Sequence, residues 1–218
     1  MYNEGSADTN NVTLAGKVVG EPEFSHEVFG EGFYIINLEV PRLSQAYDIL
    51  PITVSERIMD REIFTMGNNI GITGQIRSYN NYIESERRNK LIITVFAKDY
   101  EVLEEYHRTI PSQGGNEVFL NGFICKPPMY RTTPFGREIA DLLVAVNRSY
   151  NKSDYVPCIT WGRNARFCGR LNISDNIKLW GRLQSRIYQK KYEDGTIVDK
   201  VAYEVSASKI EIVGQEEE

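Results

Sequence analysis

The sequence repeats itself once over almost its whole length, and this repeat limits the fold more than any other feature. When the chain is shifted by 106 positions, seven identical pairs align: Gly16/Gly122, Pro22/Pro128, Gly30/Gly136, Arg42/Arg148, Asp48/Asp154, Pro51/Pro157 and Arg57/Arg163. After one inserted residue the match continues with Asn69-Ile70 on Asn176-Ile177 and Gly74 on Gly181. A period this long is too large for a solenoid repeat, so it predicts two folded domains in tandem.

The repeat and the composition between its copies predict the division of the chain. We expect a disordered polar N-terminus at residues 1–10 and a first domain at 11–110. Residues 111–116, rich in Pro, Gly, Ser and Asn, are expected to be a linker. A second domain is expected at 117–213, followed by a short acidic tail at 214–218.

Short alternating segments separated by Gly and Pro indicate β-structure in both copies. In the second copy, apolar residues share one parity in five segments: 118–124, 142–146, 156–160, 177–183 and 201–207. A short helix is expected between the third and fourth strands, at 162–171 in the second copy and at 56–66 in the first. Another is expected at 99–108, before the linker. The predicted fold class is therefore all-β: two tandem OB-folds, each a five-stranded Greek-key barrel with a short helix between strands three and four.

The net charge of −5 is unevenly distributed between the two copies. Residues 1–110 contain 10 Lys and Arg against 17 Asp and Glu, a net charge of −7. Residues 111–218 contain the remaining 15 and 13, a net charge of +2, and three of those acids are the terminal residues 216–218. The sequence thus predicts a basic second domain behind an acidic first one.

The outward parity of the second copy alternates aromatic rings with cations. Tyr155, Pro157, Ile159 and Trp161 are expected to point outward from the third strand. The fourth strand and its hairpin, together with the loop before strand three, add Tyr150, Arg148, Arg182, Arg186, Tyr188, Lys190 and Lys191. Unpaired bases stack on such rings while Lys and Arg contact phosphates, so this pattern favours binding of single strands. Outward rings also occur in dimer interfaces, which is the alternative for any one of them.

The first copy keeps the buried parity but loses most of the rings. Its third strand reads Ile49, Pro51, Thr53 and Ser55 on the outward parity, whereas its hairpin keeps Arg77 and Tyr79. We therefore expect the first domain to bind weakly or to be mainly structural, with Arg77 and Tyr79 as its candidate contacts.

Catalytic, metal-binding and membrane-spanning patterns are lacking in the sequence. The two histidines, His26 and His107, stand apart, and Cys125, Cys158 and Cys168 lack metal-ligand spacing. The odd cysteine count argues against a disulfide framework and favours a cytoplasmic protein. There is no Gly-rich phosphate loop, and no run of about 18 apolar residues that could span a membrane. We expect neither an enzyme nor a metal or cofactor.

Three segments of the second copy resemble the bacterial single-stranded DNA-binding protein (SSB) family, of the type with two OB-folds in one chain. They are residues 136–148 (GREIADLLVAVNR), 154–163 (DYVPCITWGR) and 181–188 (GRLQSRIY), and residues 199–213 are similar to the last strand of that family. The first copy matches only through the repeat. The resemblance implies stacking roles for Tyr150, Tyr155, Trp161 and Tyr188, with the position of Tyr150 approximate because the loop length varies.

The resemblance also implies what the protein does and with whom. It implies binding of single-stranded DNA without sequence preference in replication, recombination and repair, in the bacterial cytoplasm at the nucleoid. It further implies a homodimer that presents four OB-folds, with replication or repair proteins as partners. The family's flexible tail ends in an acidic tip with an aromatic residue, whereas residues 214–218 have acids only, so recruitment through a tail is not carried over. The alternatives are an OB-fold adaptor whose main surface binds protein, and an RNA-binding module.

Overall fold

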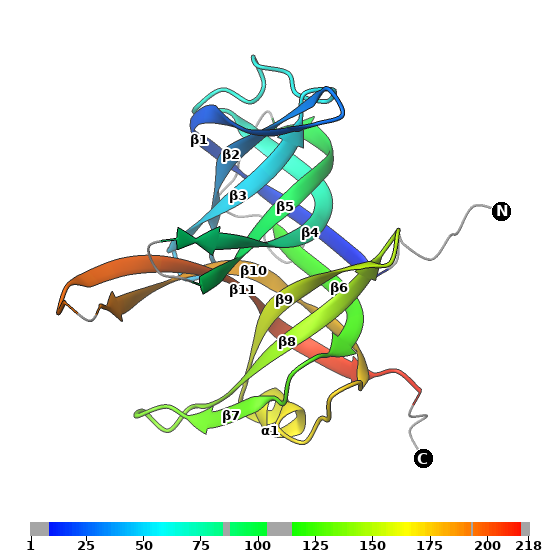
Figure 1. Ribbon diagram of the computed structural model, residues 1–218, viewed down its shortest axis with the longest axis vertical. Coiled ribbons are helices and arrows are strands. Elements are labelled where there is room, and N and C mark those ends of the chain that lie inside the picture. Colours follow the sequence, from blue (N-terminus) through cyan, green and yellow to red (C-terminus); the bar gives the residue numbers. More distant parts are fainter. Residues whose placement is uncertain (1–8, 85–87, 104–114, 193, 215–218) are drawn as a thin grey trace.

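Each half of the chain forms a closed five-stranded β-barrel in the computed structural model, which describes residues 9–84, 88–103, 115–192 and 194–214 (Figure 1). The strands of the first barrel are β1 (Asn10–Val28), β2 (Glu31–Pro41), β3 (Tyr47–Ser55), β4 (Asn69–Ile83) and β5 (Arg88–Val102). Strand β1 pairs with β2 and β4, β2 with β3, and β4 with β5, and a parallel pairing of β3 with β5 closes the barrel. This order is that of the OB-fold.

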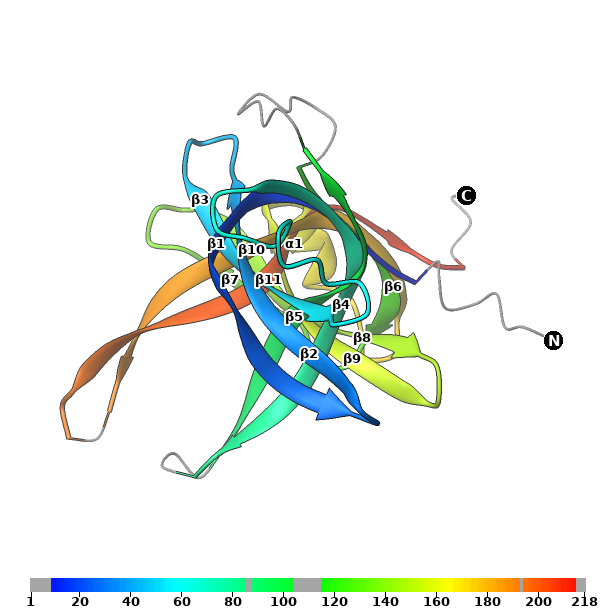
Figure 2. The same ribbon diagram turned by 90° about the horizontal axis from the view of Figure 1, so that it is seen from above.

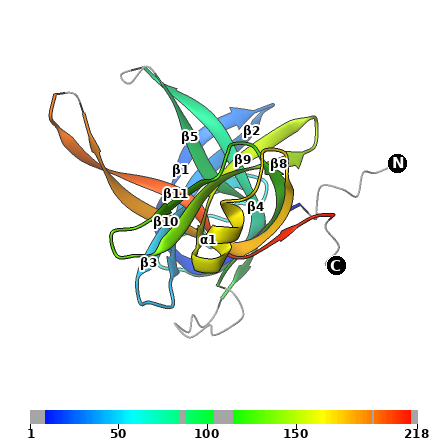
Figure 3. The ribbon, with the colours of Figure 1, turned by 90° about the horizontal axis from the view of Figure 1, so that it is seen from below.

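The second barrel repeats the same connections. Its elements are β6 (Asn116–Ile124), β7 (Met129–Thr132), β8 (Glu138–Arg148), β9 (Lys152–Trp161), α1 (Gly162–Cys168), β10 (Asn176–Lys191) and β11 (Ile197–Ile212). Strand β6 pairs with β8 and β10, and a parallel pairing of β9 with β11 closes this barrel, while β7 adds an edge strand to β8. Figure 3 shows α1 at the lower end of the barrel, where Ala165 and Cys168 are buried. The predicted fold class of two tandem OB-folds is confirmed.

The two barrels are joined by an antiparallel pairing of β1 with β6 that has an internal twofold relation. Asn10 pairs with Leu120, Val12 with Val118 and Leu14 with Asn116. Residues 10, 12 and 14 are equivalent to residues 116, 118 and 120 in the repeat, so each residue of β1 pairs as its equivalent in β6 does. The Asn10 side-chain amide donates a hydrogen bond to the carbonyl oxygen of Ile76 and accepts one from its backbone N–H. The Asn116 side chain makes the same two hydrogen bonds with Leu183. The β4–β5 and β10–β11 hairpins both extend beyond the barrels (Figure 2).

Two further contacts between the barrels are related by the same internal twofold symmetry. The carboxylate of Asp48, on β3, accepts hydrogen bonds from the backbone N–H of Ser185 on β10 (2.6 Å) and from its hydroxyl. The carboxylate of Asp154, on β9, accepts one from the backbone N–H of Ser78 on β4 (2.7 Å). Both aspartates are fully buried. We call these contacts the β3–β10 seam and the β4–β9 seam.

Several predicted boundaries differ from the structure. The connection between β3 and β4 is a series of turns, not the helix expected at residues 56–66, and residues 99–102 continue β5 instead of starting a helix. Asn10 is a buried strand residue and not part of a disordered terminus, and Asn116 begins β6 and not a linker. Most of the N-terminus (1–8), the linker region (104–114) and the tail (215–218) lie outside the described residues.

Candidate nucleic-acid interface

Two aromatic side chains of β9 project from the second barrel, as the sequence predicts. Tyr155 is 42% exposed and Trp161 is 43% exposed, whereas Val156 and Cys158 between them point into the core. Ile159 shares their parity but is buried, which corrects the expectation that it points to solvent. Pro157 is partly exposed. The face of β9 therefore offers one ring near each end of the strand.

Tyr150 lies at the tip of the turn between β8 and β9 and is 94% exposed. Tyr150 and Asn151 both have a positive φ, 64° and 51°, in the three-residue connection between the paired residues Arg148 and Lys152. This backbone directs the Tyr150 ring away from the barrel, where it contributes little to the core.

The β10–β11 hairpin carries the other predicted ring and most of the predicted cations. The guanidinium of Arg186 lies 5.9 Å from the ring centroid of Tyr188, and the ammonium of Lys190 lies 4.4 Å from that of Tyr192. Lys191 is exposed near the end of the strand. In the parallel register Ile159 is opposite Ser206, and Ala202 of β11 pairs with Arg186, so the Tyr155 end of β9 points toward the hairpin.

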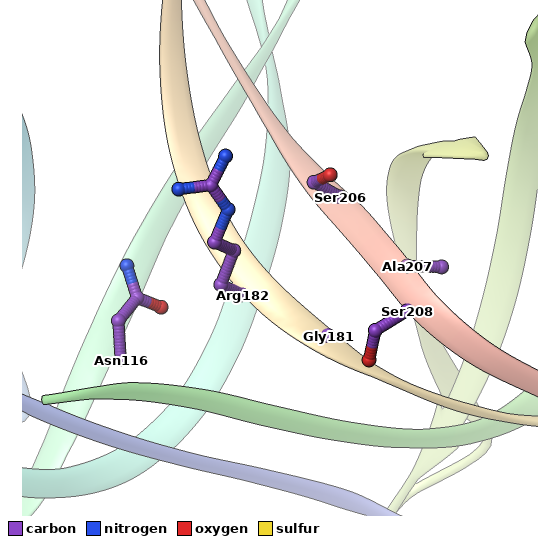
Figure 4. A pocket seen from close by; sticks show the side chains of 6 residues that line it. All are labelled: Asn116, Gly181, Arg182, Ser206, Ala207 and Ser208. Carbon is purple, nitrogen blue, oxygen red and sulfur yellow. The ribbon is translucent and has the colours of Figure 1, made fainter. Parts of the chain in front are cut away.

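Arg182 lies apart from these rings, beside a shallow hollow of about 320 Å³ between β10 and β11 (Figure 4). The hollow is lined by Asn116, Gly181, Arg182, Ser206, Ala207 and Ser208. One nitrogen of Arg182 donates to Oε1 of Gln184 at 3.2 Å. Gly181 lies against the backbone of β11, where a Cβ atom would come within 2.3 Å of the Ser206 carbonyl oxygen, so this position requires glycine.

Arg148 and Arg77 meet at the β4–β9 seam and not on the outward face of their own barrels. Nη1 of Arg77 lies 3.1 Å from Oδ2 of Asp154, and Nη1 of Arg148 lies 3.6 Å from Oδ1 of the same carboxylate. Their side chains are 25% and 30% exposed. Tyr79, two residues beyond Arg77, is exposed on the β4–β5 hairpin. Parity along one strand did not reveal this convergence, because it depends on the packing of one barrel against the other.

A row of three rings crosses the first barrel, and the sequence prediction missed it. The His26 ring of β1 stacks on Phe33 of β2, with centroids 4.9 Å apart and planes inclined by 13°. The Phe33 ring lies 6.0 Å from that of Phe96 on β5, and the Arg77 guanidinium lies 6.0 Å from the Phe96 centroid. We call His26, Phe33 and Phe96 the ring row. The available signal was the parity of the fifth strand, where Ile93, Val95 and Ala97 are buried and Phe96 lies on the opposite face. The prediction had placed Phe96 on the buried parity of that strand.

The thiols and carboxylates of the described residues form no group of three or more that could hold a metal ion. Cys158 and Cys168 are buried and Cys125 is partly buried. Burial raises the pKa of Cys168 to about 11 and raises that of Cys158 still further, so both remain neutral thiols at neutral pH. Within the part of the chain that the structure describes, no helix is long and apolar enough to cross a membrane.

The fold and this surface define a class of proteins: two OB-folds fused in one chain, with exposed rings and cations on the second barrel. The wild-type single-stranded DNA binding protein from Thermus aquaticus has this fold, with a TM-score of 0.72, 19% identity, and coverage of 96% of this chain and 95% of that one. The single-strand binding protein family model matches residues 115–213.

Two relatives from Bacillus subtilis (strain 168) match the chain in sequence. Single-stranded DNA-binding protein A is 32% identical over 101 residues, 41% of this chain and 56% of that protein. Single-stranded DNA-binding protein B is 31% identical over 86 residues, 35% of this chain and 74% of that protein. The chain belongs to the single-strand binding protein family. This family consists of DNA-binding proteins and not of enzymes, which confirms the non-enzymatic expectation. The chain spans about half the length of the first relatives that it matches.

Proposed function

We propose that this protein binds single-stranded DNA without sequence preference, through base stacking on the second barrel and phosphate contacts around it. The observation that carries the proposal is the exposure of Tyr155 and Trp161 on β9, in the half of the chain that the family model matches. Each ring offers a flat apolar face that can stack on any base, because every base has a π-face. Tyr150 and Tyr188 extend the same role into the turn and the hairpin.

The cations of the second barrel supply the sequence-independent part of the affinity. Arg182, Arg186, Lys190 and Lys191 lie on β10, and Arg148 lies at the β4–β9 seam. Contacts of Lys and Arg with phosphates release counterions, so the affinity falls as salt rises, with a log–log slope of about −0.7 per neutralised phosphate of a single strand. Such a protein acts in replication, recombination and repair, with the DNA in the cytoplasm, and replication and repair proteins are its expected protein partners.

Titration with poly(dT) tests the proposal, with Trp161 as the reporter. The chain has two tryptophans, and Trp180 packs against Phe119 at 5.2 Å between ring centroids. A Trp180→Phe background therefore leaves Trp161 as the sole tryptophan, whose fluorescence can be excited selectively. We expect saturable quenching that weakens between low and high salt. If fluorescence does not change and no DNA is retained on a filter, the chain is an adaptor that binds protein. Preference for a matched RNA strand in competition would indicate the RNA-binding alternative.

We also propose that two chains associate, so that four OB-folds act together. The support is an apolar pair on the outer face of the sheet that joins the barrels, where Phe119 of β6 and Trp180 of β10 lie side by side and the Lys209 ammonium lies 4.6 Å from the Trp180 ring centroid. Sedimentation equilibrium is expected to give twice the chain mass of 25.0 kDa, and Trp180→Asp is expected to reduce it to one chain mass. A mass of one chain for the unaltered protein at micromolar concentration would contradict the association.

A further inference from the structure

The two seams between the barrels are equivalent in position but differ in charge. At the β3–β10 seam, Arg42 pairs with Asp48 at 2.5 Å, and Arg186 lies 3.5 Å from the nearly buried carboxylate of Glu204. Two guanidinium groups therefore face two carboxylates. At the β4–β9 seam, Arg77 and Arg148 share the single carboxylate of Asp154. The repeat has thus produced one balanced seam and one seam with excess positive charge.

A third cation lies near the positively charged seam. Lys98 of β5 is exposed, and its pKa is lowered by partial burial and, to a smaller extent, by the nearby Arg77 guanidinium. An anion beside these two like charges would stabilise both of them. In addition, Nε of Arg148 is the one buried side-chain nitrogen or oxygen that lacks a hydrogen-bond partner among the residues that the structure describes. The seam thus has both positive charge and hydrogen-bonding capacity in excess of what the protein satisfies.

Aromatic surface continues from this seam in both directions. On the side of the second barrel, Tyr155 follows Asp154 directly, and its backbone N–H donates to the Ser78 hydroxyl of the first barrel at 2.7 Å. On the side of the first barrel, Arg77 lies over Phe96, where the ring row begins. Cation and rings together form one track across both barrels.

The equivalent positions of the second barrel lack these groups. Thr53 and Ile159 are equivalent, since they lie 106 positions apart in the repeat. Thr53 pairs with Phe96 and Ile159 pairs with Ser206, so Ser206 is the counterpart of Phe96. Ser78 and Ser185 are equivalent, because each donates its backbone N–H to the buried aspartate of its seam. The residues that precede them, Arg77 and Gln184, are therefore counterparts. The β3–β10 seam therefore offers neither the ring nor the extra cation, and the two possible crossings are not alike.

We propose that single-stranded DNA passes from the second barrel to the first at the β4–β9 seam, with phosphate held by Arg77, Arg148 and Lys98 and bases packed along the ring row. This inference rests on the proposed function and deepens it, because it assigns the path of the strand and gives the first barrel a direct binding role. The ring row replaces the positions that the first copy lost on its third strand.

Binding of oligothymidylates of two lengths tests the path. A strand of about 10 nucleotides fits the site of one OB-fold, whereas one of about 30 exceeds it. The test variants take their residues from the other barrel: Arg77→Gln and Phe96→Ser. The matched controls are Arg61→Gln, which removes one cation from the β3–β4 connection, and Phe29→Ala, which removes a fully exposed ring from the β1–β2 turn. Circular dichroism confirms that each variant is folded.

We expect the unaltered protein to bind the long strand more tightly than the short one. Arg77→Gln and Phe96→Ser should weaken binding of the long strand, by roughly five- to hundredfold for the lost stacking ring, and leave the short strand unaffected. Cross-linking from 5-iododeoxyuridine should reach the peptide containing Phe96 with the long strand only. The proposed path would be overturned if these variants still bound the long strand as much more tightly than the short one as the unaltered protein does. It would also be overturned if they lost affinity equally for both lengths. Failure of the unaltered protein to bind either length would overturn the proposed function itself.

Discussion

Replacement of Asp48 by alanine is expected to lower the free energy of unfolding by about 3 kcal/mol, the largest effect of any single change considered for this protein. The fully buried carboxylate accepts hydrogen bonds from Nε of Arg42 at 2.8 Å and from the backbone N–H of Ser185 at 2.6 Å. Its removal leaves the guanidinium without its carboxylate, although Nη2 of Arg42 still donates to the Ser185 carbonyl oxygen at 2.7 Å, and it leaves the N–H of Ser185 unsatisfied. The loss lies at the lower end of the range for a broken buried pair, because the Arg42 side chain is 24% exposed and can recover some hydration.

Urea unfolding followed by circular dichroism measures this effect, and Asp141→Ala is its matched control. Asp141 also pairs with an arginine, Arg131, at 2.9 Å, but both side chains are well exposed. Exposed pairs contribute about 0–1 kcal/mol, so the control should unfold close to the unaltered protein. Coincident transitions for the two variants would show that Asp48 does not hold the barrels together.

Replacement of both Tyr155 and Trp161 by alanine is expected to weaken the binding of single-stranded DNA by about 2–6 kcal/mol, at least thirtyfold. Each lost stacking ring costs about 1–3 kcal/mol. The two losses should be nearly additive, because the rings lie six residues apart along β9 and each is expected to stack on a different base. Both side chains are exposed, so the thermal unfolding temperature should change little.

Fluorescence anisotropy of a labelled oligothymidylate measures the loss, and Phe135→Ala provides the control. Phe135 is 93% exposed on the same barrel, in the turn between β7 and β8, so its removal deletes an exposed ring outside the proposed surface. Unchanged affinity of the double variant, together with a reduced mass in sedimentation, would show that Tyr155 and Trp161 form a protein interface.

The sequence predicted the barrels well because their cores follow a simple rule. Leu142, Val144 and Val146 alternate along β8, and all three are buried as expected. The rule failed at Ile159, which has the outward parity and is nevertheless covered. It also failed at residues 56–66, where apolar residues such as Phe64 are buried by a series of turns and not by a helix. Periodicity records which side chains are buried, and it does not distinguish the backbone conformations that bury them.

The candidate site was predicted less completely, for a different physical reason. Tyr155 and Trp161 lie where the alternation along one strand places them. The convergence of Arg77 and Arg148 on Asp154 brings together residues from different barrels, and the ring row brings together residues from three strands. Such contacts depend on strand order and on the joining of β1 to β6, which no single segment encodes.

The pairing of β1 with β6 within one chain also changes how the two barrels can differ. In a pair of identical chains, a substitution in one barrel necessarily appears in the other, and the association weakens on dilution. Here the linkage makes the pairing intramolecular, so it persists at any protein concentration. Each barrel can then be altered without altering its counterpart. The contrast between the balanced and the positively charged seam is an asymmetry that a pair of identical chains related by exact twofold symmetry could not contain.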